Sequence, residues 1–219
     1  MKKKTSREAI RTEIETFFHG SSVQGIRELK PFSKSLSTIK KPVVYLTPNE
    51  TLALFYIWDR AYKFVTFEED GRGVVVYTEW YENQFEDLTG GLHGSVYECR
   101  NAPTVYATHI AGVYNSDVPV PVAKETVIDD VPGEICKRIA DGRVVMRRYF
   151  SLTETEKEEI QRTMVRAIHL ERLLEPDGSE PTIAKAAFVK ERFPASWSIA
   201  EQMSAEEIEA TLAAWRKTR

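Results

Sequence analysis

The segment Phe17–Ser22 reads FFHGSS and places a histidine next to a glycine and two hydroxyl side chains. A histidine ring can hydrogen-bond a sugar hydroxyl, and glycine lets another group approach the backbone closely. The same pattern is typical of the end of an amphipathic helix, because glycine is common just after a helix C-terminus. The segment therefore supports two hypotheses: a nucleotide-binding corner built on His19, or a helix cap.

Two further positions carry side chains that suit a nucleotide site. Tyr45 lies in the β-branched run PVVYLTP and offers a ring face on which a planar group can stack. Asp117 follows Asn115 and Ser116, and a carboxylate can stabilise a developing positive charge. Each residue also has an ordinary structural interpretation, with Tyr45 as a core residue of a strand and Asp117 as a turn residue.

Taken in chain order, these residues resemble the motifs of the ADP-ribosyltransferase superfamily of the diphtheria-toxin and poly(ADP-ribose) polymerase type. That family begins its nucleotide site with a strand ending in His-Gly-Ser/Thr, which His19, Gly20 and Ser21 match. Its strand with a central tyrosine, followed directly by a helix, is matched by Tyr45 and the segment behind it. Its third motif, an acidic residue that opens a later strand, is matched by Asp117.

The resemblance covers about residues 16–130 and implies mono-ADP-ribosyl transfer from NAD to an acceptor that the sequence leaves unknown. It implies that residues 19–21 and Tyr45 bind NAD, and that Asp117, Tyr45 and His19 serve catalysis. Cleavage of the glycosidic bond leaves an oxocarbenium-like ribose, beside which a carboxylate is needed. Most active members carry glutamate at the third position, and aspartate there looks more like the rifampin transferases.

Other side chains are candidates for the same roles. Glu98, in the strand-like run VYECR, is the main alternative to Asp117 as the catalytic carboxylate because its side chain is longer. The remaining acids and histidines with weaker patterns are Glu79, Glu82, His93, His109 and His169. A packed or solvated histidine is the default interpretation on a helix, which applies to His169.

Two other functions remain open on the same pattern. The RNA 2'-phosphotransferase, an enzyme of related fold, needs basic residues that grip a phosphate, for which Arg27, Lys30 and Lys34 are the candidates. The alternative from a different class is a non-catalytic nucleotide-binding or protein-interaction module, whose helical tail docks a partner. Release of nicotinamide from NAD distinguishes a transferase from such a module.

The composition limits the class of protein. The chain has 219 residues, 42% of them hydrophobic, and 30 basic against 33 acidic residues give a net charge of -3. This balance provides no overall field for nucleic acid, and no apolar run reaches membrane-spanning length. Cys99 and Cys136 are too few for a zinc site or a disulfide framework, and the first residues lack a signal-peptide core. We therefore expect a cytoplasmic protein without a metal site.

The pattern predicts a β-rich first part. It indicates a helix from about Thr5 to Ile14 or Phe17 and a strand at PVVYLTP. A largely buried helix follows, which starts from a Thr47–Glu50 capping box with Pro48 at its first position and runs through ETLALFYIWDRAY. Asp70 and Gly71 predict a hairpin turn. The runs SVYECR, TVYATHIAGVY and DVPVPVAKETVIDDV predict further strands, the last at an edge because of its prolines.

The pattern becomes helical from Ser151. We expect a long helix from about Thr153 to Leu174, and shorter helices near Thr182–Arg192 and Ala205–Lys217. The fold class is therefore α+β, with an ADP-ribosyltransferase-like split, mostly antiparallel β core. The predicted domains are an α+β domain over residues 1–150 and a helical extension over residues 151–219.

Overall fold

The computed structural model shows a mixed α+β protein and describes residues 14–34, 42–58, 66–108 and 110–217. The chain divides into two compact units. The strand-rich unit consists of residues 1–59, 67–77 and 85–146. The helical unit consists of residues 60–66, 78–84 and 147–219. Residues 78–84, which the sequence pattern groups with the first domain, thus cluster with the helices.

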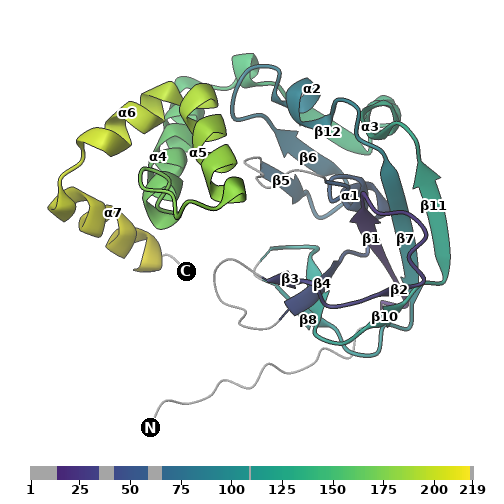
Figure 1. Cartoon of the computed structure of the whole chain (residues 1–219). Helices are drawn as coiled ribbons and strands as arrows, with labels where there is room; N and C mark the ends of the chain where they lie inside the picture. The colour runs from purple at the N-terminus through teal and green to yellow at the C-terminus, as the bar shows by residue number, and fades with distance from the viewer. Residues whose placement is uncertain (1–13, 35–41, 59–65, 109, 218–219) are drawn as a thin grey trace, which may run out of the picture. The chain divides into compact units, whose positions relative to one another are not determined.

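Three antiparallel strands of the strand-rich unit form its main sheet, in the order β1-β7-β11 (Figure 1). They are β1 (Thr16–Ser21), β7 (Gly94–Arg100) and β11 (Lys124–Ile128). The register pairs His19 with Tyr97, and Tyr97 with Glu125. Because directly opposed residues point to the same face of a sheet, these side chains share one face.

A second sheet of this unit has the order β3-β4-β9-β8. Its strands are β3 (Ser33–Lys34), β4 (Pro42–Leu46), β9 (Tyr114–Ser116) and β8 (Tyr106–Ala107). The end of β4 meets β1, since Phe18 and Thr47 exchange backbone hydrogen bonds of 2.7 and 3.0 Å. The predicted strand at PVVYLTP is confirmed, and this bridge is what brings Tyr45 next to His19.

Short strands complete the β structure. Strands β2 (Glu28–Leu29) and β10 (Val120–Pro121) form a pair, and a further sheet has the order β12-β6-β5. The members of that sheet are β5 (Thr66–Glu69), β6 (Val75–Thr78) and β12 (Val144–Arg147). The predicted turn between β5 and β6 is confirmed, because the Asp70 carboxylate accepts hydrogen bonds from the backbone N–H groups of Arg72 and Val74.

The helix behind Tyr45 is present but shorter than predicted. Helix α1 spans only Glu50–Leu54, and its N-cap is Asn49, whose side chain accepts from two backbone N–H groups. The expected capping box at Thr47 is therefore wrong, because Thr47 belongs to the bridge with β1. Helices α2 (Gln84–Thr89) and α3 (Val131–Ala140) were not predicted, although Asp130 caps α3 in the ordinary way.

The interpretation of Phe17–Ser22 as a helix end is wrong within the described residues. Strand β1 begins at Thr16, and the rest of the predicted first helix, before residue 14, lies outside the described residues. Strand β1 pairs with β7 along its whole length, and this pairing outweighs the helical spacing of the hydrophobic residues in the sequence. Glycine at position 20 is required by close packing and not by a helix C-cap, because a Cβ there would lie 2.0 Å from the carbonyl oxygen of Ala53.

In the helical unit, α4 (Glu154–Leu170) begins at Thr153 with a complete capping box that includes Glu156. It lies beside α6 (Pro194–Gln202), and α6 contacts α5 (Glu180–Arg192) in turn (Figure 1). Helix α7 spans Ala205–Lys217. The sequence predicts α4, α5 and α7 but misses α6, because Pro194 reads as a break although it occupies the first helical turn.

The predicted long helix is confirmed, and one of its faces is buried. Met164 and Ile168 are fully buried on α4, and Leu173 is buried just beyond the end of that helix, while Ile160 is half-buried. The helices in the described ranges are all too short or too polar to cross a membrane.

Candidate functional site

His19 and Tyr45 are held together by a hydrogen bond. The Nδ1 atom of His19 lies 2.8 Å from the backbone carbonyl oxygen of Tyr45. Because a carbonyl only accepts, Nδ1 carries the proton and Nε2 of the neutral ring is left as an acceptor. Burial lowers the pKa of His19 below its ordinary value, and the hydrogen bond to Tyr45 opposes that effect only in part. The ring is therefore neutral at neutral pH.

A small cavity lies beside this hydrogen bond, and we call it the tyrosine pocket. It is lined by Phe18, His19, Gly20, Tyr45, Leu46, Thr47, Ala53 and Tyr56. Its volume is about 10 Å³, which is room for roughly one water molecule. A larger ligand can enter only if side chains that line the pocket move.

The two tyrosines of the pocket come from different elements. Tyr45 lies on β4 and is half-buried, while Tyr56 follows α1 and packs its ring edge-on against Phe67, with ring centroids 5.4 Å apart. Burial, with a smaller contribution from Tyr45, raises the pKa of Tyr56 to about 12. The Tyr56 hydroxyl therefore stays protonated, and the pocket offers the aromatic rings of both tyrosines.

Gly20 and Ser21 have mainly backbone roles in the observed structure. The close approach of Gly20 to α1 brings the backbone of β1 to the wall of the tyrosine pocket. The hydroxyl of Ser21 accepts a hydrogen bond of 3.1 Å from the backbone N–H of Val23, which shapes the turn after β1.

A carboxylate lies on the same sheet face as His19, in a cross-strand row that consists of His19, Tyr97 and Glu125. Since neighbouring strands are about 5 Å apart, the backbones of His19 and Glu125 are separated by roughly 10 Å. Tyr97, whose side chain is fully buried, lies between them in the row. Glu125 is half-buried and was not among the carboxylates considered from the sequence.

Three hydrogen bonds orient the Glu125 carboxylate, and all three end on Oε1. The donors are the Ser95 hydroxyl at 2.6 Å, the backbone N–H of Gly25 at 2.8 Å and the Tyr97 hydroxyl at 3.0 Å. The hydrogen bond from Ser95, and next that from Gly25, lower the pKa of Glu125, so it is ionised at neutral pH. Among the described residues nothing binds Oε2, which leaves one charged oxygen available to a ligand.

The two carboxylates favoured by the sequence lie elsewhere. Asp117 is exposed in the turn after β9, which ends at Ser116, so it follows a strand where the family pattern expects it to open one. Glu98 points to the face of β7 opposite to Tyr97 and pairs with Arg100 at 2.6 Å. The catalytic role assigned to Asp117 stays a prediction that nothing in this geometry tests.

The weaker candidates have identifiable surroundings. Glu79 is buried and accepts hydrogen bonds from Arg148 and from the backbone N–H of Tyr149, both at 3.0 Å. Glu82 and His93 are exposed, and His169 is half-buried on α4. His109 lies outside the described residues.

Of the basic residues considered for a phosphate site, Arg27 and Lys30 make no side-chain hydrogen bond or ion pair with other described residues. Arg27 and Lys30 are exposed, and the side chain of Lys34 lies outside the described part of the chain. Within the described ranges, no group of three or more His, Cys, Asp or Glu is placed to hold a metal ion.

Sequence reasoning missed Glu125 and Tyr56. The sequence signal for Glu125 is an acid directly before the strand-forming residues Thr126, Val127 and Ile128. Its partnership with His19 depends on strand order, which a single sequence does not give. Tyr56 was assigned to a long buried helix, and only the early end of α1 at Leu54 turns it toward Tyr45.

Comparisons of the chain with protein-family models, with curated proteins and with solved structures found no match.

Proposed function

We propose that the strand-rich unit binds NAD at the tyrosine pocket and transfers its ADP-ribose group to an acceptor, with Glu125 as the carboxylate beside the reacting ribose. The observation that carries the proposal is the shared geometry of His19, Tyr45 and Glu125. His19 and Tyr45 are joined by a hydrogen bond of 2.8 Å, and Glu125 lies in the same cross-strand row as His19.

The reaction needs one bond to break and one to form at the same carbon. The bond between ribose C1' and the nicotinamide ring nitrogen breaks, and its electron pair stays with nicotinamide. The ribose becomes oxocarbenium-like, and the nucleophile of the acceptor then bonds to C1' and loses its proton. An ionised carboxylate next to the positive sugar lowers the barrier, because its charge is already in place.

Glu125 meets the requirements of that carboxylate. It is ionised, its orientation is fixed through Oε1, and Oε2 accepts no hydrogen bond from the described residues. A glutamate fixed in advance costs no reorganisation when the charge develops. Asp117 is the alternative, and it would have to reach the ribose from an exposed turn.

His19 and the two tyrosines serve binding in this proposal. With Nδ1 donating to Tyr45, the Nε2 atom of His19 can accept a hydrogen bond from a ribose hydroxyl. The rings of Tyr45 and Tyr56 provide faces for the flat nicotinamide ring. Binding requires these side chains to move, because the pocket holds only about 10 Å³, and the affinity is reduced by the free energy of that opening.

The test combines NAD binding with product release. The full chain is titrated with NAD by calorimetry, and nicotinamide is measured after incubation with NAD. His19→Ala should weaken NAD binding, whereas His93→Ala, which changes an exposed histidine, should not. Binding without any release of nicotinamide would favour the non-catalytic module, and the absence of binding would refute the proposal.

A further inference from the structure

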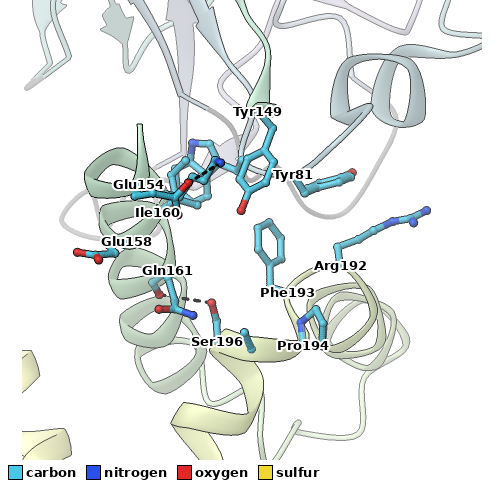
Figure 2. Close-up of a pocket in the computed structure, with 13 residues that line it drawn as sticks. Tyr81, Tyr149, Glu154, Glu158, Ile160, Gln161, Arg192, Phe193, Pro194 and Ser196 are labelled. Atoms are coloured by element: carbon cyan, nitrogen blue, oxygen red, sulfur yellow. Dashed lines mark hydrogen bonds and ion pairs between the residues drawn. The ribbon is translucent and has the colours of Figure 1, made fainter. Parts of the chain in front are cut away.

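A second and larger pocket lies entirely within the helical unit, and we call it the aromatic pocket (Figure 2). Its volume is about 360 Å³, which is in the range of small-molecule sites. Its aromatic residues are Trp80, Tyr81, Tyr149 and Phe193, and its other lining residues come from α4, from the end of α5 and from the start of α6.

Contacts within the protein hold the aromatic side chains of this pocket in place without a ligand. The buried carboxylate of Glu79 fixes Tyr149 by accepting its backbone N–H at 3.0 Å. The ring of Tyr81 packs edge-on against Phe193, with centroids 5.5 Å apart, and against Phe188 at 6.0 Å. Tyr81 and Phe193 are both buried, so these rings keep their positions.

The charged side chains around the pocket either pair with other residues or extend away from its centre. Lys157 binds Glu154 at 2.9 Å and lies over the face of the Tyr149 ring. The side chains of Arg192 and Glu158 extend away from the space between Tyr149 and Phe193 (Figure 2). Among the described residues, a phosphate or a carboxylate would therefore find no uncommitted cation in the pocket interior.

The uncharged polar groups of the lining residues include the hydroxyl of Tyr149, the side-chain amide of Gln161 and the hydroxyl of Ser196. Ser196 lies 3.5 Å from the backbone carbonyl of Gln161. In the described part of the chain, the Tyr149 hydroxyl and the Gln161 amide have no hydrogen-bond partner. Together they provide donors and acceptors between aromatic rings, and a purely apolar ligand would leave them unsatisfied.

We propose that the aromatic pocket binds a flat, uncharged heteroaromatic ring with hydrogen-bonding groups on its edge, of the nucleobase type. Because Lys157 lies over one face of the Tyr149 ring, the ligand stacks on the opposite face, and the buried ring of Phe193 adds an apolar contact. The side-chain amide of Gln161 forms hydrogen bonds with the donor and acceptor groups on the edge of the ligand ring. This inference goes beyond the proposed function and does not rest on it, because every residue involved belongs to the helical unit.

The test is a titration of the full chain with adenosine, guanosine, cytidine and uridine, followed by backbone amide NMR. At least one nucleoside should bind saturably and shift the resonances of Tyr149, Gln161 and Ser196. Gln161→Leu should weaken that binding about tenfold, the scale of a hydrogen bond lost on a polar ligand. Tyr149→Ala should weaken it by about tenfold or more, because stacking is lost as well.

The matched control is Phe150→Ala, which removes the next aromatic ring along the chain. Phe150 is 75% exposed and does not line the pocket, so nucleoside affinity should be unchanged. Tyr149→Phe keeps the ring and tests the hydroxyl alone if Tyr149→Ala unfolds. The proposal is overturned if no nucleoside binds, if the shifted resonances lie around Tyr45, or if Gln161→Leu leaves the affinity unchanged.

Discussion

The hydroxyl of Tyr97 lies 3.0 Å from Oε1 of Glu125, and it also lies 2.7 Å from the carbonyl oxygen of Val23. The hydroxyl oxygen of Tyr97 in turn accepts a hydrogen bond of 3.2 Å from the backbone N–H of Ile26. One buried tyrosine therefore ties the segment after β1 to the carboxylate on β11. The position of Glu125 and the course of residues 23–26 depend on each other.

We expect Tyr97→Phe to lower the free energy of unfolding by about 1–3 kcal/mol, because the partners of its hydroxyl are left unsatisfied in a buried place. Urea unfolding measures the change. The control is Tyr114→Phe, whose hydroxyl makes no hydrogen bond to the described residues and whose ring contact with Phe17 would be kept. An equal loss in both variants would contradict the role given to Tyr97.

The lowered pKa of His19 predicts a pH-dependent stability. Between that lowered pKa and the ordinary value of 6.5, the unfolded chain binds more protons than the folded chain. The free energy of unfolding therefore rises with pH through this window and levels off above it. His19→Gln should flatten the rise, as measured by urea unfolding from about pH 5 to about pH 8.

His169 needs a matched variant in that experiment, because burial lowers its pKa as well. His169→Gln should remove only its own part of the rise, and the two effects should add. A His19→Gln profile as steep as that of the wild type would show that His19 is not the buried neutral ring described above.

Gly20→Ala should be strongly destabilising, because the added Cβ would lie 2.0 Å from the carbonyl oxygen of Ala53. We expect a loss of roughly 1–3 kcal/mol or more, the range for overpacked positions. Gly25→Ala is the comparison, since nothing lies within 4 Å of a Cβ there and only its positive φ of 76° is unfavourable. Thermal melting should rank Gly20→Ala as the less stable variant.

Asn115 lies opposite Tyr45 on β9, and its fully buried side-chain amide has no partner among the described residues. Replacing an unsatisfied buried amide by an apolar group of similar shape removes its desolvation cost. Asn115→Leu should therefore raise the free energy of unfolding by about 1–2 kcal/mol. A lower melting temperature would mean that the amide has a partner in solution, such as a bound water.

Much of the fold could be predicted because the local signals agree with it. The hairpin at Asp70, the strand around Tyr45 and the long helix from about Thr153 each show a local pattern that agrees with the fold. The errors fall where tertiary pairing overrides local spacing. Ile10, Ile14 and Phe17 have helical spacing, but β1, which contains Phe17, gains hydrogen bonds to β7 along its length.

The candidate site could be predicted only for residues close in sequence to a recognisable motif. His19, Gly20 and Tyr45 were found because each lies in a short run with its own pattern, and the structure brings them to one pocket. Glu125 could not be identified in this way, because it reaches the row of His19 only through the order β1-β7-β11. Strand order is set by long-range pairing, which spacing alone does not reveal.

The central claim concerns the carboxylate, and its most direct test is the rate of nicotinamide release from NAD by the wild type and by Glu125→Gln. The exchange keeps the shape of the side chain and removes its charge, so the fold and most of the NAD affinity should be retained. We predict a loss of turnover on the order of a hundredfold or more, the scale of removing one electrostatic stabiliser. Asp117→Asn and Glu98→Gln, measured in parallel, should release nicotinamide at nearly the wild-type rate. A Glu125→Gln variant as fast as the wild type, beside an inactive Asp117→Asn, would contradict the assignment of Glu125.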